Sequence, residues 1–322
     1  MNNKSISTND TYLIIKHGAL GDMVQGLDAF QSLRSSLPSA KLTLLTTPTF
    51  VSLVKLMPYF DRVIIDERKP FYNLKKTHQI RQHFLNDWSA VIDLQCSRRT
   101  NAYFKWFYKQ SGRKWIGTAK GCSHPMPDFA NLNNRDRMLE AIKMVGARAH
   151  KADLSWLTDK QSRPPEPFGI TKPYCVIIPG SSPQKPSKRW PQRRYAELSS
   201  RIFKLGVTPY VVGTKAEKSV IQEICNRSSG AESLVDKTNL AQLAQICSNA
   251  QFVVGNDTGP TFLAAKTGII TLMLMGSDTN PQMSSPTGNA SAYVYKADIR
   301  SITVEEVIYE IQKLGGLPTL KG

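Results

Sequence analysis

Short apolar runs of strand length alternate with helical patterns along this chain, and that alternation constrains the fold more than any other feature. The first half holds four such runs, at Tyr12–Ile15, Leu42–Leu45, Val63–Ile65 and Val91–Leu94. A continuous apolar run indicates a strand buried on both faces, and helices between parallel strands supply the cover. We therefore predict an α/β fold with a parallel sheet.

The alternation is interrupted once, by the proline-rich connector Gln161–Pro167, which cannot be helical. It then resumes, with strands predicted at 175–178, 208–212, 252–254 and 269–273 and helices at 192–205, 216–226, 239–248 and 303–314. We predict two doubly wound, Rossmann-like domains, at residues 1–165 and 166–302, followed by a helical segment at 303–322. Such sheets bind ligands beyond the carboxyl ends of their strands, so two facing domains would form a cleft.

Composition limits both the cellular location of the protein and the kinds of metal site that it can hold. No apolar run approaches the roughly 20 residues of a membrane span, and Met1–Asp10 lacks the apolar core of a secretory signal, so we expect a cytoplasmic protein. Five scattered cysteines and five histidines show no metal-ligand spacing, and no Asp-x-Asp pair is present to hold a divalent ion. Cys175, Cys225 and Cys247 lie in apolar patterns typical of core residues. We predict no metal site and no cofactor.

The net charge of +17 is unevenly placed. Residues 1–165 hold 25 Lys and Arg against 13 Asp and Glu, whereas residues 166–322 hold 17 against 12. A basic first half indicates an anionic partner, for which an anionic membrane surface or lipid and a nucleic acid are both compatible; a merely soluble basic surface is the alternative.

Four loops that follow predicted strands carry polar groups suited to chemistry. In Lys16–Met23, two glycines permit a sharp turn, but their spacing does not match the fingerprint of dinucleotide-binding proteins. Asp22 in this loop is either a helix N-cap or a general base. Pro179–Pro191 combines hydroxyls with Lys185, Lys188 and Arg189, as a metal-free diphosphate site requires, and it is not a Walker A loop; a charged surface loop is the alternative.

The other two loops follow later strands. In Val211–Glu217, the acid Glu217 could accept hydrogen bonds from a ribose or simply cap the next helix. In Val254–Thr261, a strand ending in Asn-Asp-Thr-Gly-Pro turns into a helix, which offers backbone N–H groups, hydroxyls and one carboxylate to a sugar diphosphate. An ordinary capped helix explains the same residues.

Together these loops give the sequence a resemblance to glycosyltransferase family 9, whose best-known members are the ADP-heptose:lipopolysaccharide heptosyltransferases. The resemblance is carried by Leu20–Asp22, by Pro-Gly-Ser-Ser and Lys-Arg-Trp-Pro within 179–191, and by Asp-Thr-Gly-Pro and Leu-Ala-Ala within 255–265. It implies a GT-B fold and an inverting, metal-independent reaction in the cleft. The donor would lie on the C-terminal domain and the acceptor on the N-terminal one, with the last helix in a position to pack back on the first domain.

The resemblance also implies roles for single residues. Asp22 matches the proposed catalytic base, and Lys188 would offset charge on the departing nucleotide diphosphate. The donor-binding positions are Ser181, Ser182, Lys188, Glu217, Asp257, Thr258 and Gly259. Many heptosyltransferases carry His where this chain has Phe262, which puts the identity of the sugar in doubt.

For the basic first half the resemblance implies an anionic glycolipid acceptor at the inner face of the cytoplasmic membrane, and nucleic acid is not expected. The predicted acceptor or membrane-binding residues are Gly18, Gly21, Arg98, Arg99, Lys105 and Lys109, with aromatic residues at 104 and 106–108 interleaved. The alternative is that these aromatics are the buried face of a helix.

The leading prediction is heptose transfer from ADP-heptose to a lipopolysaccharide inner-core acceptor. The same chemistry with another nucleotide sugar or glycolipid acceptor is the first alternative. A non-catalytic basic module that binds nucleic acid or membrane is the second.

Overall fold

The computed structural model describes residues 10–127, 132–158, 169–182, 185–288 and 290–318. The chain divides into two compact units, Met1–Asp153 and Leu154–Gly322. This division falls earlier than the predicted boundary at 165, because Leu154 and Leu157 are buried and the short helix that follows Leu154 packs on a helix of the second unit. The predicted connector Gln161–Pro167 lies outside the described residues.

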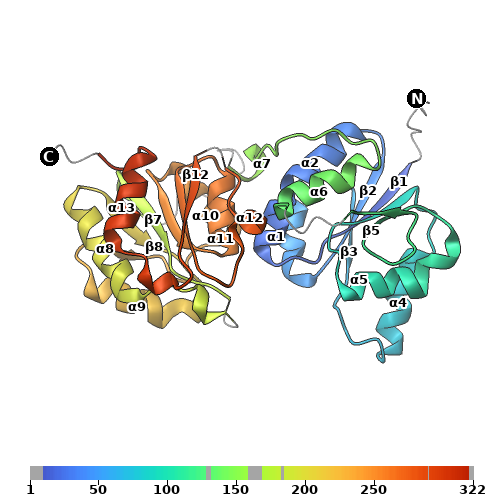
Figure 1. Ribbon diagram of the computed structural model, residues 1–322, viewed down its shortest axis with the longest axis horizontal. Coiled ribbons are helices and arrows are strands. Elements are labelled where there is room, and N and C mark those ends of the chain that lie inside the picture. The colour runs from blue at the N-terminus through green and yellow to red at the C-terminus, as the bar shows by residue number, and fades with distance from the viewer. Residues whose placement is uncertain (1–9, 128–131, 159–168, 183–184, 289, 319–322) are drawn as a thin grey trace. The chain divides into compact units, whose positions relative to one another are not determined.

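The first unit is a parallel sheet of six strands in the order β3-β2-β1-β4-β5-β6 (Figure 1). Its elements are β1 (Thr11–Ile15), α1 (Leu20–Gln25), α2 (Leu27–Ser36), β2 (Lys41–Thr46), α3 (Val51–Leu56), β3 (Arg62–Ile65), α4 (Leu74–Phe84), β4 (Ala90–Asp93), α5 (Arg98–Tyr103), β5 (Trp115–Gly117), β6 (His124–Pro125) and α6 (Asn134–Lys143).

The second unit repeats this plan, with the strand order β12-β11-β10-β7-β8-β9. Its elements are α7 (Ser155–Thr158), β7 (Tyr174–Ile178), α8 (Gln192–Lys204), β8 (Thr208–Val211), α9 (Lys218–Arg227), β9 (Glu232–Ser233), α10 (Leu240–Asn249), β10 (Val253–Asn256), α11 (Gly259–Lys266), β11 (Thr271–Met275), α12 (Pro281–Ser284), β12 (Ser291–Tyr295) and α13 (Val304–Lys313).

Both sheets therefore have the Rossmann strand order, in which the first and fourth strands are neighbours. In the second unit those strands are β7 and β10, which pair in parallel with Ile178 beside Gly255. In the first unit they are β1 and β4, with Ile15 beside Asp93. The loops that follow each pair leave the sheet at the same edge, where the strand order reverses, and this edge is where such sheets bind ligands.

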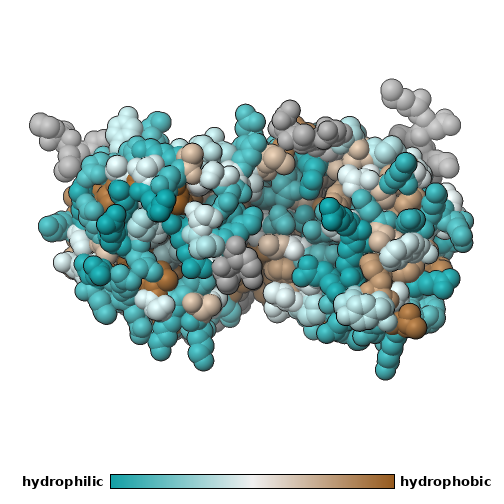
Figure 2. Space-filling view, turned by 60° about the horizontal axis from the view of Figure 1, so that its bottom comes forward, coloured by the Kyte–Doolittle hydropathy of each residue, from teal (hydrophilic) through white to brown (hydrophobic). Residues whose placement is uncertain are grey.

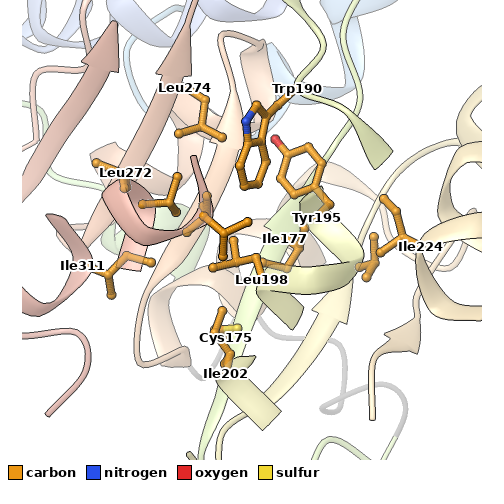
Figure 3. Close-up of a cluster of buried hydrophobic side chains, with 14 of the residues drawn as sticks. Cys175, Ile177, Trp190, Tyr195, Leu198, Ile202, Ile224, Leu272, Leu274 and Ile311 are labelled. Carbon is orange, nitrogen blue, oxygen red and sulfur yellow. The ribbon is translucent and has the colours of Figure 1, made fainter. Parts of the chain in front are cut away.

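Apolar side chains fix the helices on the sheets. In the second unit, Trp190, Tyr195, Leu198 and Ile202 pack with residues of the strands and of α13 (Figure 3). The buried face of α13, with Val304, Val307 and Ile311, belongs to this core of the second unit. That the last helix packs back on the first domain stays a prediction.

No helix in the described part of the chain is long and apolar enough to cross a membrane. Cys175 and Cys247 are fully buried and Cys225 is half-buried, as their apolar surroundings predict, and the cysteines are free thiols. The described residues contain no group of three His, Cys, Asp or Glu placed to hold a metal ion.

Candidate functional site

The predicted donor-binding residues gather at the carboxyl edge of the second sheet. Ser181 and Lys188 lie in the loop after β7, Glu217 follows β8, and Asp257 directly follows β10. A glycine at 255 makes this convergence possible: a Cβ there would lie 2.4 Å from Thr261 Oγ1 and 2.8 Å from Ile178 Cβ. The two central strands and the start of α11 can therefore approach closely only with glycine at this position.

Asp257 is the hub of the charged groups at this edge. Its Oδ2 accepts a hydrogen bond from the Lys188 ammonium and another from the Thr279 hydroxyl. The Asp257 side chain is 5% exposed and that of Lys188 is 14% exposed, so the ion pair is largely shielded from water. The carboxylate thus holds a cation at the start of α11. Thr279 was not among the predicted residues.

Thr258 and Gly259 begin helix α11. Thr258 is the extended N-cap residue, yet its side chain makes no capping hydrogen bond. Pro260 has no N–H group and so adds no unpaired donor of its own to the first turn. The hydroxyl of Thr258 and the positive end of the helix together present a surface that favours an anion.

Asn256 joins the β10 strand to the loop after β7. The side chain is fully buried, and its Oδ1 accepts hydrogen bonds from the Trp190 N–H at 3.1 Å and the Tyr195 hydroxyl at 2.8 Å. Its Nδ2 donates to the Pro179 carbonyl at 2.7 Å. The sequence analysis did not single out this residue, although an amide at the end of an apolar strand run was a usable signal.

Ser181 serves the shape of its loop. The residue is 4% exposed; its hydroxyl accepts a hydrogen bond from Arg189 Nε at 3.0 Å and lies 3.2 Å from the Lys185 carbonyl, to which it donates. Ser182 is exposed beside it. Pro183 and Gln184, within the same predicted loop, lie outside the described residues.

Glu217 caps the helical segment in which it lies, which is the second of the two roles considered for it; its ribose-binding role stays a prediction. Its Oε2 accepts a hydrogen bond from the Thr214 N–H at 2.8 Å and so completes a capping box at the start of the α9 region. It also lies against the loop after β7, since a Cβ on Gly180 would be 3.1 Å from Glu217 Cγ. The carboxylate is therefore at the edge of the sheet and adjacent to the Ser181 loop.

The first unit presents Asp22 at the corresponding edge of its own sheet. Asp22 is the third residue of α1 and is half-buried. Its two oxygens accept hydrogen bonds from the Ala19 N–H and from Asn134 Nδ2 of α6, each at 3.3 Å. These bonds are long, which leaves the carboxylate oriented but weakly held and able to accept a proton from another group.

The turn before Asp22 depends on glycine. Gly18 has a φ of +65°, and a Cβ there would lie 2.7 Å from Met23 Cγ. Gln95 Oε1, after β4, accepts the N–H groups of His17 at 2.9 Å and Gly18 at 3.1 Å. Gly21 lies in the first turn of α1. The two predicted glycines therefore shape the backbone around Asp22.

Lys16, directly after β1, is a buried cation that the sequence analysis did not assign. It is 1% exposed, and its Nζ donates to the Leu94 carbonyl at 3.2 Å. Burial lowers its pKa; the nearby Asp22 carboxylate raises it and Arg137 lowers it. Lys16 thus places a positive charge close enough to Asp22 to interact with it electrostatically.

Arg99 belongs to a buried network around Asp66. Asp66 Oδ2 accepts a hydrogen bond from the Tyr103 hydroxyl at 2.5 Å and lies 3.4 Å from Arg99 Nε. His17 Nε2 lies 3.1 Å from the same oxygen, but without hydrogen-bond geometry. Burial alone would raise the pKa of Asp66, but His17 and Tyr103 hold that pKa down to about 2. A cavity of about 480 Å³ opens beside this network, and its cations include Lys69, Lys76 and Arg99.

The basic aromatic segment differs from its predicted surface. Phe104 and Tyr108, in the π-helical turn after α5, are 4% and 1% exposed and pack in the core of the first unit. The buried-face alternative is therefore correct for these two rings, and Trp106, at 53% exposed, is the one that faces outward. Arg98, Lys105 and Lys109 are exposed, whereas Arg99 is half-buried.

Comparison with known proteins decides the family. The model of "Glycosyltransferase family 9 (heptosyltransferase)" matches residues 132–306, more than half of the chain. The chain belongs to glycosyltransferase family 9. It is accordingly a glycosyltransferase, and its two six-stranded α/β units are the GT-B fold of that family.

Relatives of this family 9 member are distant but extend over most of its length. Lipooligosaccharide heptosyltransferase 2 of Haemophilus ducreyi is 23% identical over 79% of this chain and 79% of its own, and that of Haemophilus influenzae is 22% identical over 88% and 87%. The structure of Escherichia coli heptosyltransferase WaaC with ADP has a TM-score of 0.75 at 18% identity, covering 94% of this chain and 99% of WaaC. WaaC was also solved with ADP-2-deoxy-2-fluoro heptose.

Proposed function

We propose that this family 9 enzyme transfers heptose from ADP-heptose to a hydroxyl of a lipopolysaccharide inner-core acceptor, with inversion at the anomeric carbon and without a metal. The observation that carries the proposal is the arrangement just before α11, where Asp257 holds Lys188 and accepts a second hydrogen bond from Thr279, next to the N-cap residue Thr258. A shielded cation, a hydroxyl and a helix N-terminus together suit a diphosphate. The heptose derivative of ADP solved with WaaC supports the choice of donor.

The chemistry assigned to each residue follows from its group. Asp22 takes the proton from the acceptor hydroxyl as that oxygen attacks the anomeric carbon. The bond between that carbon and the diphosphate oxygen breaks, and the electron pair leaves with ADP. Lys188 offsets the charge that grows on the departing diphosphate, which is the role a divalent ion has in other transferases.

The basic first unit supports an anionic acceptor. Lys69, Lys76 and Arg99 line its cavity beside β3, and these cations suit phosphate or carboxylate groups on an inner-core glycolipid. The H. ducreyi and H. influenzae relatives are named as enzymes of lipooligosaccharide, which points to the same class of acceptor. We expect the enzyme to work at the cytoplasmic side of the inner membrane.

Transfer from a panel of donors tests the donor and the acceptor together. The enzyme is incubated with an inner-core acceptor and ADP-heptose, or with UDP-, GDP- or CMP-linked sugars, and the acceptor is analysed by mass spectrometry and NMR. We expect one heptosyl residue to be added with inverted configuration. Among the donors tested, only ADP-heptose should support this transfer, and a chelator should not prevent it. Transfer only from a UDP or GDP sugar would keep the glycosyltransferase but overturn the ADP-heptose assignment.

A further inference from the structure

The two most exposed large apolar side chains among the described residues are Tyr72, in the loop between β3 and α4, and Leu74, the first residue of α4. Tyr72 is 85% exposed and Leu74 is 77% exposed. Figure 1 shows this connection projecting from the sheet of the first unit, next to α5. Single exposed apolar residues are common on protein surfaces, so their meaning depends on what surrounds them.

The exposure is imposed by a well-packed loop. Phe71 packs edge-on against Trp106, with ring centroids 4.6 Å apart, and against Tyr103 at 5.8 Å. The Asn73 N–H donates to the Pro70 carbonyl at 2.9 Å, and the Asn73 side chain caps α4. Tyr72 and Leu74 are therefore held outward by their neighbours, and the half-exposed Trp106 ring lies beside the same loop.

Cations surround these apolar side chains. Residues 67–76 and 98–109 hold eight Lys and Arg and a single acid, Glu67, which pairs with Lys76. The exposed cations are Arg68, Lys69, Lys75, Arg98, Lys105 and Lys109. Figure 2 shows apolar surface on the first unit bordered by hydrophilic residues.

We propose that Tyr72, Leu74 and Trp106, together with these exposed cations, form a docking surface for an anionic lipid bilayer. Tyr and Trp rings partition into the interface between headgroups and acyl chains, and a leucine adds apolar area below them. Each basic residue near an anionic leaflet adds electrostatic attraction, which salt screens. This proposal rests on the proposed function, because a glycolipid acceptor lies in a membrane and gives the enzyme a reason to dock there. Lipid binding can nevertheless be measured without heptose transfer.

Vesicle co-sedimentation with the full chain tests the surface. The probes are phosphatidylcholine vesicles with and without phosphatidylglycerol, at low and at high salt. We expect binding to the anionic vesicles only, weaker at high salt, and at least ~10-fold weaker for the double variant Tyr72→Ser/Leu74→Ser. The matched control Leu56→Ser/Tyr309→Ser also removes one exposed Leu and one exposed Tyr, 50% and 63% exposed, and should bind like wild type.

Fluorescence provides a second readout that a folding defect would not imitate. The difference between wild type and Trp106→Phe isolates one of the five tryptophans, and this signal should shift to the blue with anionic vesicles. Three results would overturn the docking surface. The first is an equal loss of vesicle binding in both double variants, and the second is no binding of wild type to anionic vesicles. The third is a wild-type dimer that does not bind lipid and that Tyr72→Ser/Leu74→Ser abolishes. Vesicle binding without any transfer from ADP-heptose would overturn the proposed function and leave the docking surface standing.

Discussion

At the scale of single residues, the charged groups at the carboxyl edge of the second sheet are organised around a paired lysine. Lys188 is fixed by Asp257, which in turn is held by Thr279. A paired cation keeps its position without substrate, so little reorganisation is needed when a diphosphate arrives. Asp257 is thus a positioning residue for Lys188 as much as a ligand-binding candidate of its own.

Replacing the paired lysine should weaken nucleotide binding. Charge-assisted hydrogen bonds contribute about 1.5–3 kcal/mol, so Lys188→Met should raise the Kd for ADP by roughly 10- to 100-fold in calorimetry. Lys185→Met, at an exposed lysine of the same loop, is the control and should change it little. A loss of equal size in both variants would mean that the general charge of the loop, and not the ion pair, binds the diphosphate.

The buried Asp66 network predicts a pH dependence of stability. The pKa of Asp66 is about 2 in the folded chain against 3.8 for an ordinary aspartate. The ionised carboxylate therefore adds to the free energy of unfolding above about pH 4, and this added stability disappears as the pH falls towards 2. The contribution is about 2 kcal/mol. In urea unfolding, wild type should lose more stability between pH 5 and pH 3 than Asp66→Asn does. Parallel losses in the two proteins would show that other groups control acid unfolding.

At the scale of elements, the strand ends hold the site loops through buried polar contacts. Asn256 makes hydrogen bonds to Trp190, Tyr195 and Pro179, which are distant in the sequence. These bonds tie the loop after β7 to the end of β10. The position of Lys188 beside Asp257 follows from this connection.

Removing the Asn256 amide should lower the stability of the fold and weaken the binding of ADP. Asn256→Leu leaves the Trp190 N–H and the Tyr195 hydroxyl buried without their acceptor, at about 1–3 kcal/mol each. We expect a loss of several kcal/mol in the free energy of unfolding, measured with urea, and weaker ADP binding. Asn249→Leu, whose amide bonds only to the Gln245 carbonyl of its own helix, should cost far less. Equal stability of the two variants would refute the role of Asn256.

Sequence patterns predicted the elements that carry strong local signals and missed those that do not. The runs at Tyr12–Ile15 and Cys175–Ile178 became the central strands β1 and β7 because every strand interior residue there is buried. The short strand β5 and the edge strand β12 were not predicted: Trp115–Gly117 is only three residues long, and Ser291–Tyr295 is partly exposed throughout.

The candidate site was predictable only where a motif lies in one stretch of chain. Asp22, Lys188 and Asp257 were found from such stretches. Thr279 and the partners of Asn256 were not, because their roles arise from contacts between segments that only the folded sheet brings together. Tyr72 and Leu74 were missed for a related reason: exposure of an apolar residue is a property of the packed loop and not of its composition.

At the scale of the whole molecule, two Rossmann units divide the proposed work. The second unit holds the groups suited to the nucleotide diphosphate, and the first holds Asp22, the basic cavity and the proposed docking surface. The excess positive charge lies mainly in the first half, which is consistent with an anionic acceptor there.

The measurement that tests the central claim most directly compares Asp22→Asn with wild type in heptose transfer from ADP-heptose. Asp136→Asn is the matched control, since Asp136 is likewise an acid at the third position of a helix. We predict that Asp22→Asn lowers kcat by ~10² or more while the Kd for ADP stays within about twofold, and that Asp136→Asn changes neither appreciably. Transfer by Asp22→Asn at close to the wild-type rate would contradict the account, because the acceptor hydroxyl would then lose its proton to another group.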